Sequence, residues 1–155
     1  MKKLFSLCLI CLLAVSAMAQ DQNVNVVVIG GGSSSSSGDY VDLGLPSKTL
    51  WKDKNEGGNY HTYEEAVGRF GNKLPTKQQL EELKNKCTWT WTGNGYKVTG
   101  PNGNFITLPA AGYQTYYGSE VSIGTMGEYM SSTPAHSDGI PHELCFNSSK
   151  VYTAY

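Results

Sequence analysis

The spacing of apolar residues changes from helical to alternating at Cys87, and that change restricts the fold more than any other feature of the sequence. From Thr62 to Cys87, apolar side chains recur at the three- and four-residue intervals of a helix with one buried face. Downstream, from Thr88 to Thr92, threonine and tryptophan alternate, as in a half-buried strand. With its helices early and its sheet late, the chain is predicted to be α+β.

Two helices are expected before the change. Each begins with a capping box, in which Thr is followed three residues later by Glu or Gln. The predicted helices cover residues 62–70, with the box Thr62–Glu65 and a stop at Gly71, and residues 76–87, with the box Thr76–Gln79. In the second helix, Glu82 and Lys86 have the i,i+4 spacing of an ion pair on the solvent side.

Antiparallel strands are expected in the rest of the domain, with long irregular loops in the second half. Turn residues at 93–95 and 101–103 separate three runs, which predicts a meander. The predicted strands cover residues 40–43, 49–51, 88–92, 96–99, 105–108, 129–132, 143–147 and 150–155.

Residues 1–19 have the composition of a secretory signal peptide. Lys2 and Lys3 precede the apolar stretch Leu4–Val15, and Ala17-Met18-Ala19 is a small-x-small cleavage pattern. The apolar stretch is too short to span a membrane. Cys11 lies inside it, so we expect no lipid anchor. We expect export to the periplasm or the cell exterior.

Removal of the signal peptide changes the charge and the predicted class of protein. Two of the 12 basic residues and none of the 13 acidic residues lie in residues 1–19, so 10 basic and 13 acidic side chains remain. A modestly acidic chain does not favour nucleic-acid binding. We expect neither a cytosolic enzyme nor a membrane span, and the oligomeric state stays open.

Residues 20–39 are predicted to be a flexible linker that includes a short apolar strand at Asn23–Ile29. Three glycines and five serines follow that strand, but the third glycine of a dinucleotide-binding loop is replaced by Ser35 and no helix pattern follows. Residues 40–155 then form a single domain.

Cys87 and Cys145 remain after the signal peptide is removed. In an exported protein, two cysteines can form a disulfide. The alternative is two separately buried thiols that pack as small apolar groups. Sequence alone leaves both open.

The segment from Gly112 to Thr133 has the composition of a binding loop, because 15 of its 22 residues are Gly, Ser, Thr or Tyr. The alternative is that these aromatic residues complete the core, since residues 40–155 contain as many Phe, Trp and Tyr as Leu, Ile and Val. The candidate ligand-binding residues are Tyr113, Tyr116, Tyr117 and Tyr129, with Trp89 and Trp91 from the first strand of the meander.

No motif favours catalysis, a cofactor or a metal. The histidines and cysteines lack the spacing of a zinc site, and no nucleophile elbow is present. His61, before a helix cap, is expected at the surface, and His142 in a loop. We therefore predict that the protein is not an enzyme.

Several stretches resemble the Fibrobacter succinogenes major paralogous domain family over residues 40–155. The matching stretches are Tyr40–Trp51, Gly71–Lys77, Cys87–Trp91, Gly95–Asn104, Leu108–Gly112 and Ser131–Thr133. The resemblance implies an exported bacterial protein with a C-type-lectin-like fold, shared with formylglycine-generating enzymes, and a recognition role.

The chain departs from the family pattern at three places. Lys52–Asn55 stands where relatives often carry a cysteine, so Cys87 lacks its usual candidate partner. Met130 replaces an aromatic residue, and the chain stops at Tyr155, before the expected closing strand. The calcium-binding signatures of lectins and the catalytic cysteines of formylglycine-generating enzymes are not found, so neither property carries over.

These observations lead to two hypotheses of different classes. The first is a non-catalytic recognition module that binds a glycan or protein ligand through its Tyr-, Ser- and Gly-rich loops. The alternative is a structural or assembly protein of the bacterial envelope, in which Val26–Ile29 or an open sheet edge pairs with a neighbour.

Overall fold

The computed structural model of the chain describes residues 29–30, 40–56, 60–136 and 140–155. These residues form two α-helices, a short 3-10 helix and antiparallel strands in small sheets, which confirms the α+β class. The predicted signal peptide and most of the predicted linker lie outside the described residues. Within the described residues, no helix is long and apolar enough to cross a membrane.

Both predicted helices are present and both begin at the predicted capping boxes. Helix α2 (Tyr63–Phe70) has Thr62 as its N-cap, and Thr62 Oγ1 accepts a hydrogen bond from the backbone N–H of Glu65 at 3.2 Å. Helix α3 (Lys77–Lys86) is capped in the same way by Thr76 and Gln79. Between the helices, the 3-10 helix η2 covers Gly71–Lys73.

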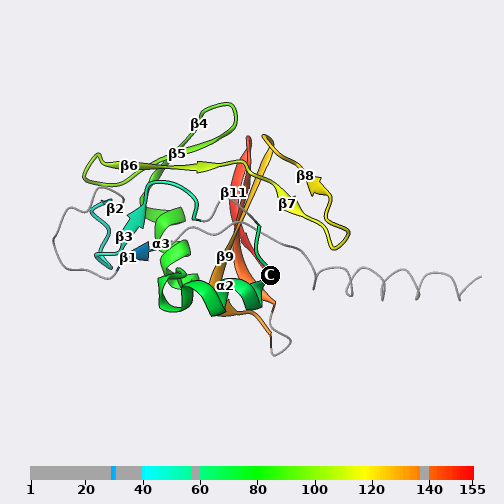
Figure 1. The fold of residues 1–155 in the computed structure, drawn as a ribbon. Coiled ribbons are helices and arrows are strands. Elements are labelled where there is room, and N and C mark those ends of the chain that lie inside the picture. Colours follow the sequence, from blue (N-terminus) through cyan, green and yellow to red (C-terminus); the bar gives the residue numbers. More distant parts are fainter. Residues whose placement is uncertain (1–28, 31–39, 57–59, 137–139) are drawn as a thin grey trace, which may run out of the picture.

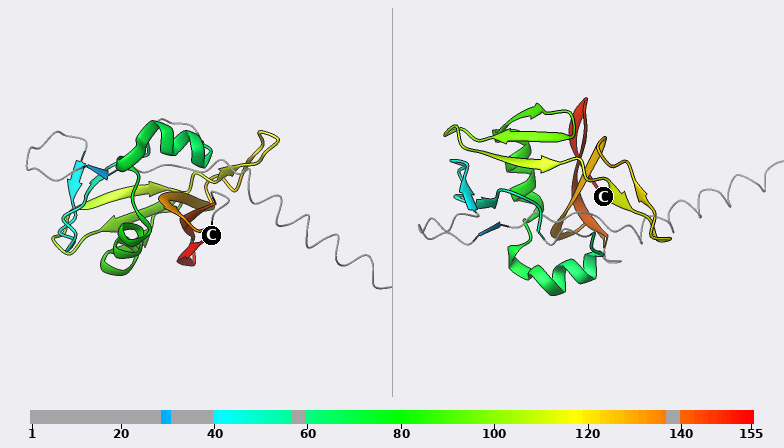
Figure 2. Two further views of the ribbon diagram at one scale, coloured as in Figure 1. Left: turned by 90° about the horizontal axis from the view of Figure 1, so that it is seen from below. Right: turned by 45° about the horizontal axis from the view of Figure 1, so that its top comes forward.

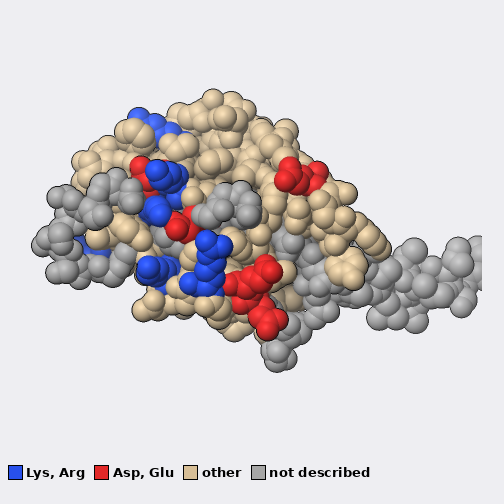
Figure 3. Space-filling model, viewed as in Figure 1, with Lys and Arg blue, Asp and Glu red and all other residues tan. Residues whose placement is uncertain are grey.

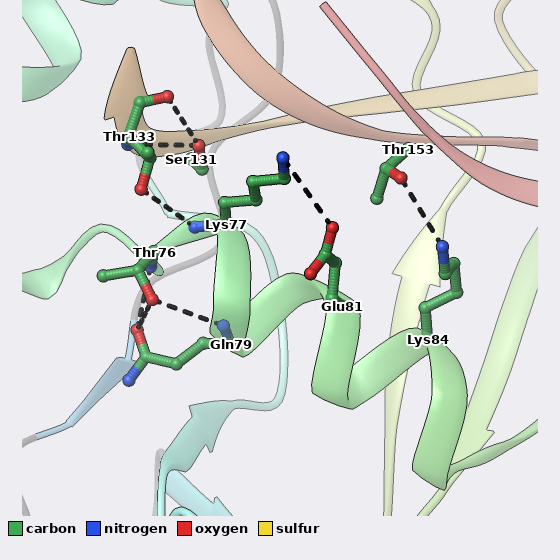
Figure 4. Close-up of polar contacts among 8 residues, drawn as sticks. All are labelled: Thr76, Lys77, Gln79, Glu81, Lys84, Ser131, Thr133 and Thr153. Carbon is green, nitrogen blue, oxygen red and sulfur yellow. Dashed lines mark hydrogen bonds and ion pairs between the residues drawn. The ribbon is translucent and has the colours of Figure 1, made fainter. Parts of the chain in front are cut away.

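Helix α3 is hydrogen-bonded to two strands of the sheet formed by the last part of the chain, as Figure 4 shows. The backbone N–H of Lys77 donates to Thr133 Oγ1 at 3.0 Å, and Lys84 Nζ donates to Thr153 Oγ1 at 3.5 Å. An i,i+4 ion pair on this helix joins Lys77 and Glu81. These contacts hold the helix across the sheet.

The predicted Glu82–Lys86 ion pair is wrong for the described residues, where the ion pairs are Lys52–Glu56 and Lys77–Glu81. Instead, Glu82 Oε1 accepts a hydrogen bond from the backbone N–H of Ser47 at 3.1 Å. The i,i+4 spacing allows this ion pair, but the carboxylate of Glu82 is instead hydrogen-bonded to the loop that contains Ser47.

The predicted meander is confirmed as a sheet of strands β4 (Thr88–Trp91), β5 (Gly95–Thr99) and β6 (Phe105–Pro109). Its register pairs Trp89 with Val98, and Val98 with Ile106. Because side chains alternate across a strand, these paired residues share one face, and that face packs against the main core.

The C-terminal sheet has the strand order β11–β10–β9, with strands β9 (Met126–Pro134), β10 (Pro141–Asn147) and β11 (Lys150–Ala154). Its inner face presents Tyr129, Leu144 and Phe146 to the main core. Met130, on the other face, packs with Ala66 and Phe70 of α2. Figure 1 shows this sheet between the meander and α2.

The N-terminal sheet has the order β1–β3–β2, with strands β1 (Ile29–Gly30), β2 (Tyr40–Asp42) and β3 (Leu50–Lys52). Strands β2 and β3 were predicted. Ile29 pairs with Trp51, so the end of the predicted apolar strand lies against its own domain. Residues 23–28 of that strand lie outside the described residues.

The segment predicted as long irregular loops contains more regular structure than expected. Strand β9 begins at Met126 rather than Tyr129, and strands β7 (Tyr113–Gln114) and β8 (Glu120–Val121) form a hairpin. Figures 1 and 2 show the hairpin projecting away from the body of the domain. The prediction missed it because each strand is only two residues long, too short for a periodic pattern.

Candidate functional site

Two of the three most exposed large aromatic side chains of the described residues lie together at the end of the β7–β8 hairpin. Tyr116 is 71% exposed and Tyr117 is 83% exposed. Their rings meet edge to face, with centroids 5.4 Å apart and an interplanar angle of 77°. The hairpin end therefore presents a pair of rings with polar hydroxyls to solvent.

The turn that carries the two tyrosines is closed by its own hydrogen bonds. The backbone N–H of Gly118 donates to the carbonyl of Thr115 at 2.8 Å, and that of Thr115 donates to the carbonyl of Ser119 at 2.9 Å. Thr115 Oγ1 accepts from the N–H of Ser119 at 3.2 Å. Gly118 has a φ of 79°, in the left-handed region that glycine adopts without steric cost.

The base of the hairpin is anchored to the domain through backbone contacts. The N–H of Gly112 donates to the carbonyl of Met126 at 2.7 Å, and Gly112 forms a parallel bridge with Gly127 of β9. A Cβ at Gly112 would lie 2.0 Å from the carbonyl oxygen of Val121. Tyr60 also donates its hydroxyl to the carbonyl of Ala111, at 2.6 Å.

The prediction that Tyr129 binds a ligand is wrong, because its side chain is fully buried. Its ring stacks on Phe146 with centroids 5.8 Å apart. Its hydroxyl donates to Asn55 Oδ1 and to the carbonyl of Pro109, at 3.0 and 2.8 Å. Burial also raises the pKa of Tyr129 above its ordinary value. Tyr129 is a core residue.

Tyr113, Trp89 and Trp91 are half-buried and do not join the exposed pair. Tyr113 packs on the cluster around Met130. Both tryptophans lie edge-on to Tyr96, with centroid distances of 5.4 and 5.1 Å. Of the six predicted ligand-binding residues, the structure brings together only Tyr116 and Tyr117 at an exposed site, and gives the other four packing contacts.

Of the two alternatives left open for Cys87 and Cys145, the structure has two free thiols and not a disulfide. Cys87 packs against the main core at the end of α3. Cys145 alternates with Leu144 and Phe146 along β10, so it points to the opposite face of the sheet. The sheet therefore separates the two thiols, and burial with the nearby Glu82 carboxylate raises the pKa of Cys87 to about 11.

The histidines lie differently from the sequence expectation. His61 is 6% exposed rather than at the surface, and its ring lies edge-on to Phe70 with centroids 5.4 Å apart. Burial and the neighbouring Arg69 lower the pKa of His61. His142 lies in strand β10, not in a loop. Over the described part of the chain, no group of three or more His, Cys, Asp or Glu residues is placed to hold a metal ion.

Sequence reasoning missed two carboxyl groups on the outer face of the C-terminal sheet. Glu128 is 7% exposed, and its Oε2 has no hydrogen-bond partner. Burial and the charge of Glu128 raise the pKa of Glu143 to about 7. A signal was available, since Glu143 lies inside a predicted strand and Glu128 directly precedes another, in a segment that contains no Lys or Arg.

Charged side chains are unevenly distributed over the face shown in Figure 3, where they gather over and around the two helices. The upper part of this face, over the meander, is largely uncharged. The acidic patch beside it lies over β8, the strand that contains Glu120.

Comparison of the chain with protein-family models, with curated proteins and with solved structures finds no match.

Proposed function

We propose that the protein is a non-catalytic recognition module that binds a glycan or protein ligand through Tyr116 and Tyr117. The observation that carries this proposal is the exposure of two adjacent rings on an anchored, projecting hairpin. Burial of such rings is a main source of binding energy in protein interfaces, and tyrosine adds a hydroxyl for hydrogen bonding.

The hairpin reduces the entropic cost of this binding. The turn is closed by backbone hydrogen bonds and its base is bonded to β9, so the tyrosine backbone is ordered before a ligand arrives. A tyrosine side chain has only two rotatable angles to fix. Preorganisation of this kind leaves more of the contact energy as net affinity.

The finer assignments belong to the same proposal. The stretches that resemble the Fibrobacter succinogenes major paralogous domain family support a C-type-lectin-like domain over residues 40–155, and the α+β architecture is compatible with it. Residues 1–19 support export to the periplasm or the cell exterior. Fold alone does not set function, so the binding site rests on the hairpin.

A glycan array, combined with a pull-down from a bacterial envelope extract, tests the proposal. We expect binding that falls at least about tenfold when Tyr116 and Tyr117 are both replaced by Ala, since two hot-spot rings each contribute over 1 kcal/mol. Phe105→Ala is the matched control, because Phe105 is 49% exposed on the meander. Unchanged binding by the double variant would exclude this site.

A second candidate, assembly through strand pairing, is favoured by the edge of the C-terminal sheet. Among the described strands, β11 pairs only with β10, so its outer backbone groups have no strand partner there. Sedimentation at increasing protein concentration tests this candidate. Oligomers that form as the concentration rises would support it, and a monomer at all concentrations would exclude it.

A further inference from the structure

The outer face of the C-terminal sheet gathers polar side chains in a row across three strands. Cys145 of β10 pairs with Glu128 of β9 and with Tyr152 of β11. Directly paired residues point to the same face, and Glu143 lies on that face two residues from Cys145. Burial and the nearby carboxyls of Glu128 and Glu143 raise the pKa values of Cys145 and Tyr152.

At the β9 end of this row lies an acid with an oxygen that has no hydrogen-bond partner. Glu128 is more than nine-tenths buried, and its Oε2 is shielded from solvent without a hydrogen-bond partner. Neither Glu128 nor Glu143 forms an ion pair within the described residues. A buried polar group without a hydrogen-bond partner destabilises the folded state by about 1–3 kcal/mol. A ligand that donates a hydrogen bond to Glu128 would remove this penalty.

The chemistry of the row defines the missing partner. In their ionised form the two carboxylates only accept hydrogen bonds, so a partner that stabilises this form is a hydrogen-bond donor with a positive charge. The ring of Tyr152 adds a π face that attracts cations. The protein already places an ammonium there, since Lys150 Nζ lies 4.5 Å from the centroid of that ring.

The raised pKa values of the two carboxyls link the binding of a cation to their ionisation. Burial raises the pKa of Glu128, and burial together with Glu128 raises that of Glu143 to about 7. The other titratable groups of the row are Cys145 and Tyr152, whose pKa values are also raised, with Lys150 at its end. A bound ammonium would favour the ionised carboxyls and release a proton.

We propose that Glu128 and Glu143, beside the ring of Tyr152, form a binding site for a primary ammonium group. Glu143 and Tyr152 are only partly buried, so solvent reaches the site at these two residues. The ligand is a lysine side chain of a partner polypeptide or a free alkylamine, and both share this chemistry. The site is independent of the hairpin tyrosines.

Binding of small probes to the purified protein tests this site. N-acetyl-lysine methylamide is titrated at pH 8 and followed by calorimetry and by the amide NMR signals of β9 to β11. N-acetyl-norleucine methylamide is the matched uncharged probe, butane-1,4-diamine represents free amines, and calcium chloride represents metal ions. We expect saturable binding of the lysine probe or of the diamine, and whichever binds more tightly identifies the source.

Two variants locate the site. Glu128→Gln should weaken binding at least about tenfold, because a hydrogen bond to a charged group contributes about 1.5–3 kcal/mol. Glu64→Gln, an exposed acid of α2, is the matched control and should leave binding unchanged. If Glu128→Gln does not fold, Glu143→Gln takes its place with the same expected loss.

The pH dependence gives a readout that nonspecific charge attraction would not. Binding of the amine should tighten from pH 6 to pH 8 with proton release, and Glu143→Gln should flatten this dependence. Equal binding of the norleucine probe, tighter binding of calcium than of either amine, or wild-type affinity in Glu128→Gln would each overturn the proposal. Loss of binding in the Tyr116→Ala, Tyr117→Ala variant would overturn the independence of the site.

Discussion

The C-terminal sheet and the β7–β8 hairpin are neighbours in sequence and both carry tyrosines, but they use them in opposite ways. In the sheet, Tyr129 is fully buried between strands and stacks on Phe146. At the hairpin end, Tyr116 and Tyr117 contact chiefly each other and remain exposed. Tyrosine content alone therefore does not mark a binding surface. A tyrosine ring belongs to the core where other side chains pack over it, and to the surface where none do.

The physical origin of the difference is strand pairing. Tyr129 lies opposite Leu144 on β10, and its face of the sheet is covered by the meander and α3 through the main core. The hairpin has only two short strands and extends past that core. The following predictions test this contrast from the largest expected effect to the smallest.

Phe146→Ala should cause the largest loss of stability. The ring is fully buried and contacts the rings of Trp89, Tyr96 and Tyr129, so its removal leaves a cavity in the main core. The free energy of unfolding should fall by about 4 kcal/mol. Urea unfolding measures it, with Phe105→Ala as the exposed control. Equal losses in both variants would contradict the assignment of core and surface.

Gly112→Ala should destabilise the protein more than Gly118→Ala, although both residues have positive φ angles, of 66° and 79°. A Cβ at Gly112 would meet the carbonyl oxygen of Val121 at 2.0 Å, whereas a Cβ at Gly118 meets open space. We expect a loss of about 3 kcal/mol at Gly112, from strain plus overpacking, and about 1 kcal/mol at Gly118, from strain alone. Thermal unfolding of the two variants makes the comparison. A larger loss of stability in Gly118→Ala than in Gly112→Ala would contradict the anchoring of the hairpin at its base.

The outer face of the sheet should make stability depend on pH. The pKa of Glu143 is raised to about 7 in the folded protein, above the ordinary value near 4.5. The folded state therefore holds the proton more tightly than the unfolded state. The contribution of Glu143 to the free energy of unfolding is largest below about pH 4.5 and is lost as the pH rises through about 7.

Urea unfolding between pH 5 and pH 8 measures this effect in the absence of amines. The midpoint should fall as the pH rises, by less than in the two preceding tests because Glu143 is partly exposed and solvent screens its charge. Glu143→Gln should show a smaller dependence, and Glu64→Gln the dependence of the original protein. A midpoint that rises over this range in the original protein and falls in Glu143→Gln would refute the assignment.

Tyr116→Ala together with Tyr117→Ala should have the smallest effect on stability, within about 0.5 kcal/mol for each exposed position. Both rings are largely exposed and the turn is held by backbone groups, which these substitutions keep. Thermal unfolding measures the change. A loss comparable to that of Phe146→Ala would mean that the rings pack against the domain and are not presented to a ligand.

Local patterns in the sequence predicted most of the regular structure. The capping boxes at Thr62 and Thr76 predicted both helix starts, because the interacting atoms lie within three residues of each other. Strands β4 to β6 were predicted for the same reason, since alternation and turn residues are local. The β7–β8 hairpin was missed, because its anchorage depends on Gly112 meeting β9.

The candidate site was predicted only in part. Composition pointed to the segment that contains Tyr116 and Tyr117, but it also selected Tyr129, whose burial depends on strand β10 from later in the chain. Glu128 was not predicted as a site residue, because an acid in a polar segment is expected to be exposed to solvent. Its burial becomes evident only when β9 is placed in the folded domain. Cys145 was a candidate for a disulfide until alternation placed it across the sheet from Cys87.

Short-range spacing and turn chemistry are enough to specify the α+β class, the capped helices and the antiparallel meander. The tertiary structure was needed to separate core tyrosines from surface tyrosines, to assign Cys145 to one face of its strand, and to show that Glu128 is buried with an unpartnered Oε2. Those outcomes depend on which residues from distant segments lie opposite each other in a sheet. The local spacing of apolar residues does not specify these contacts.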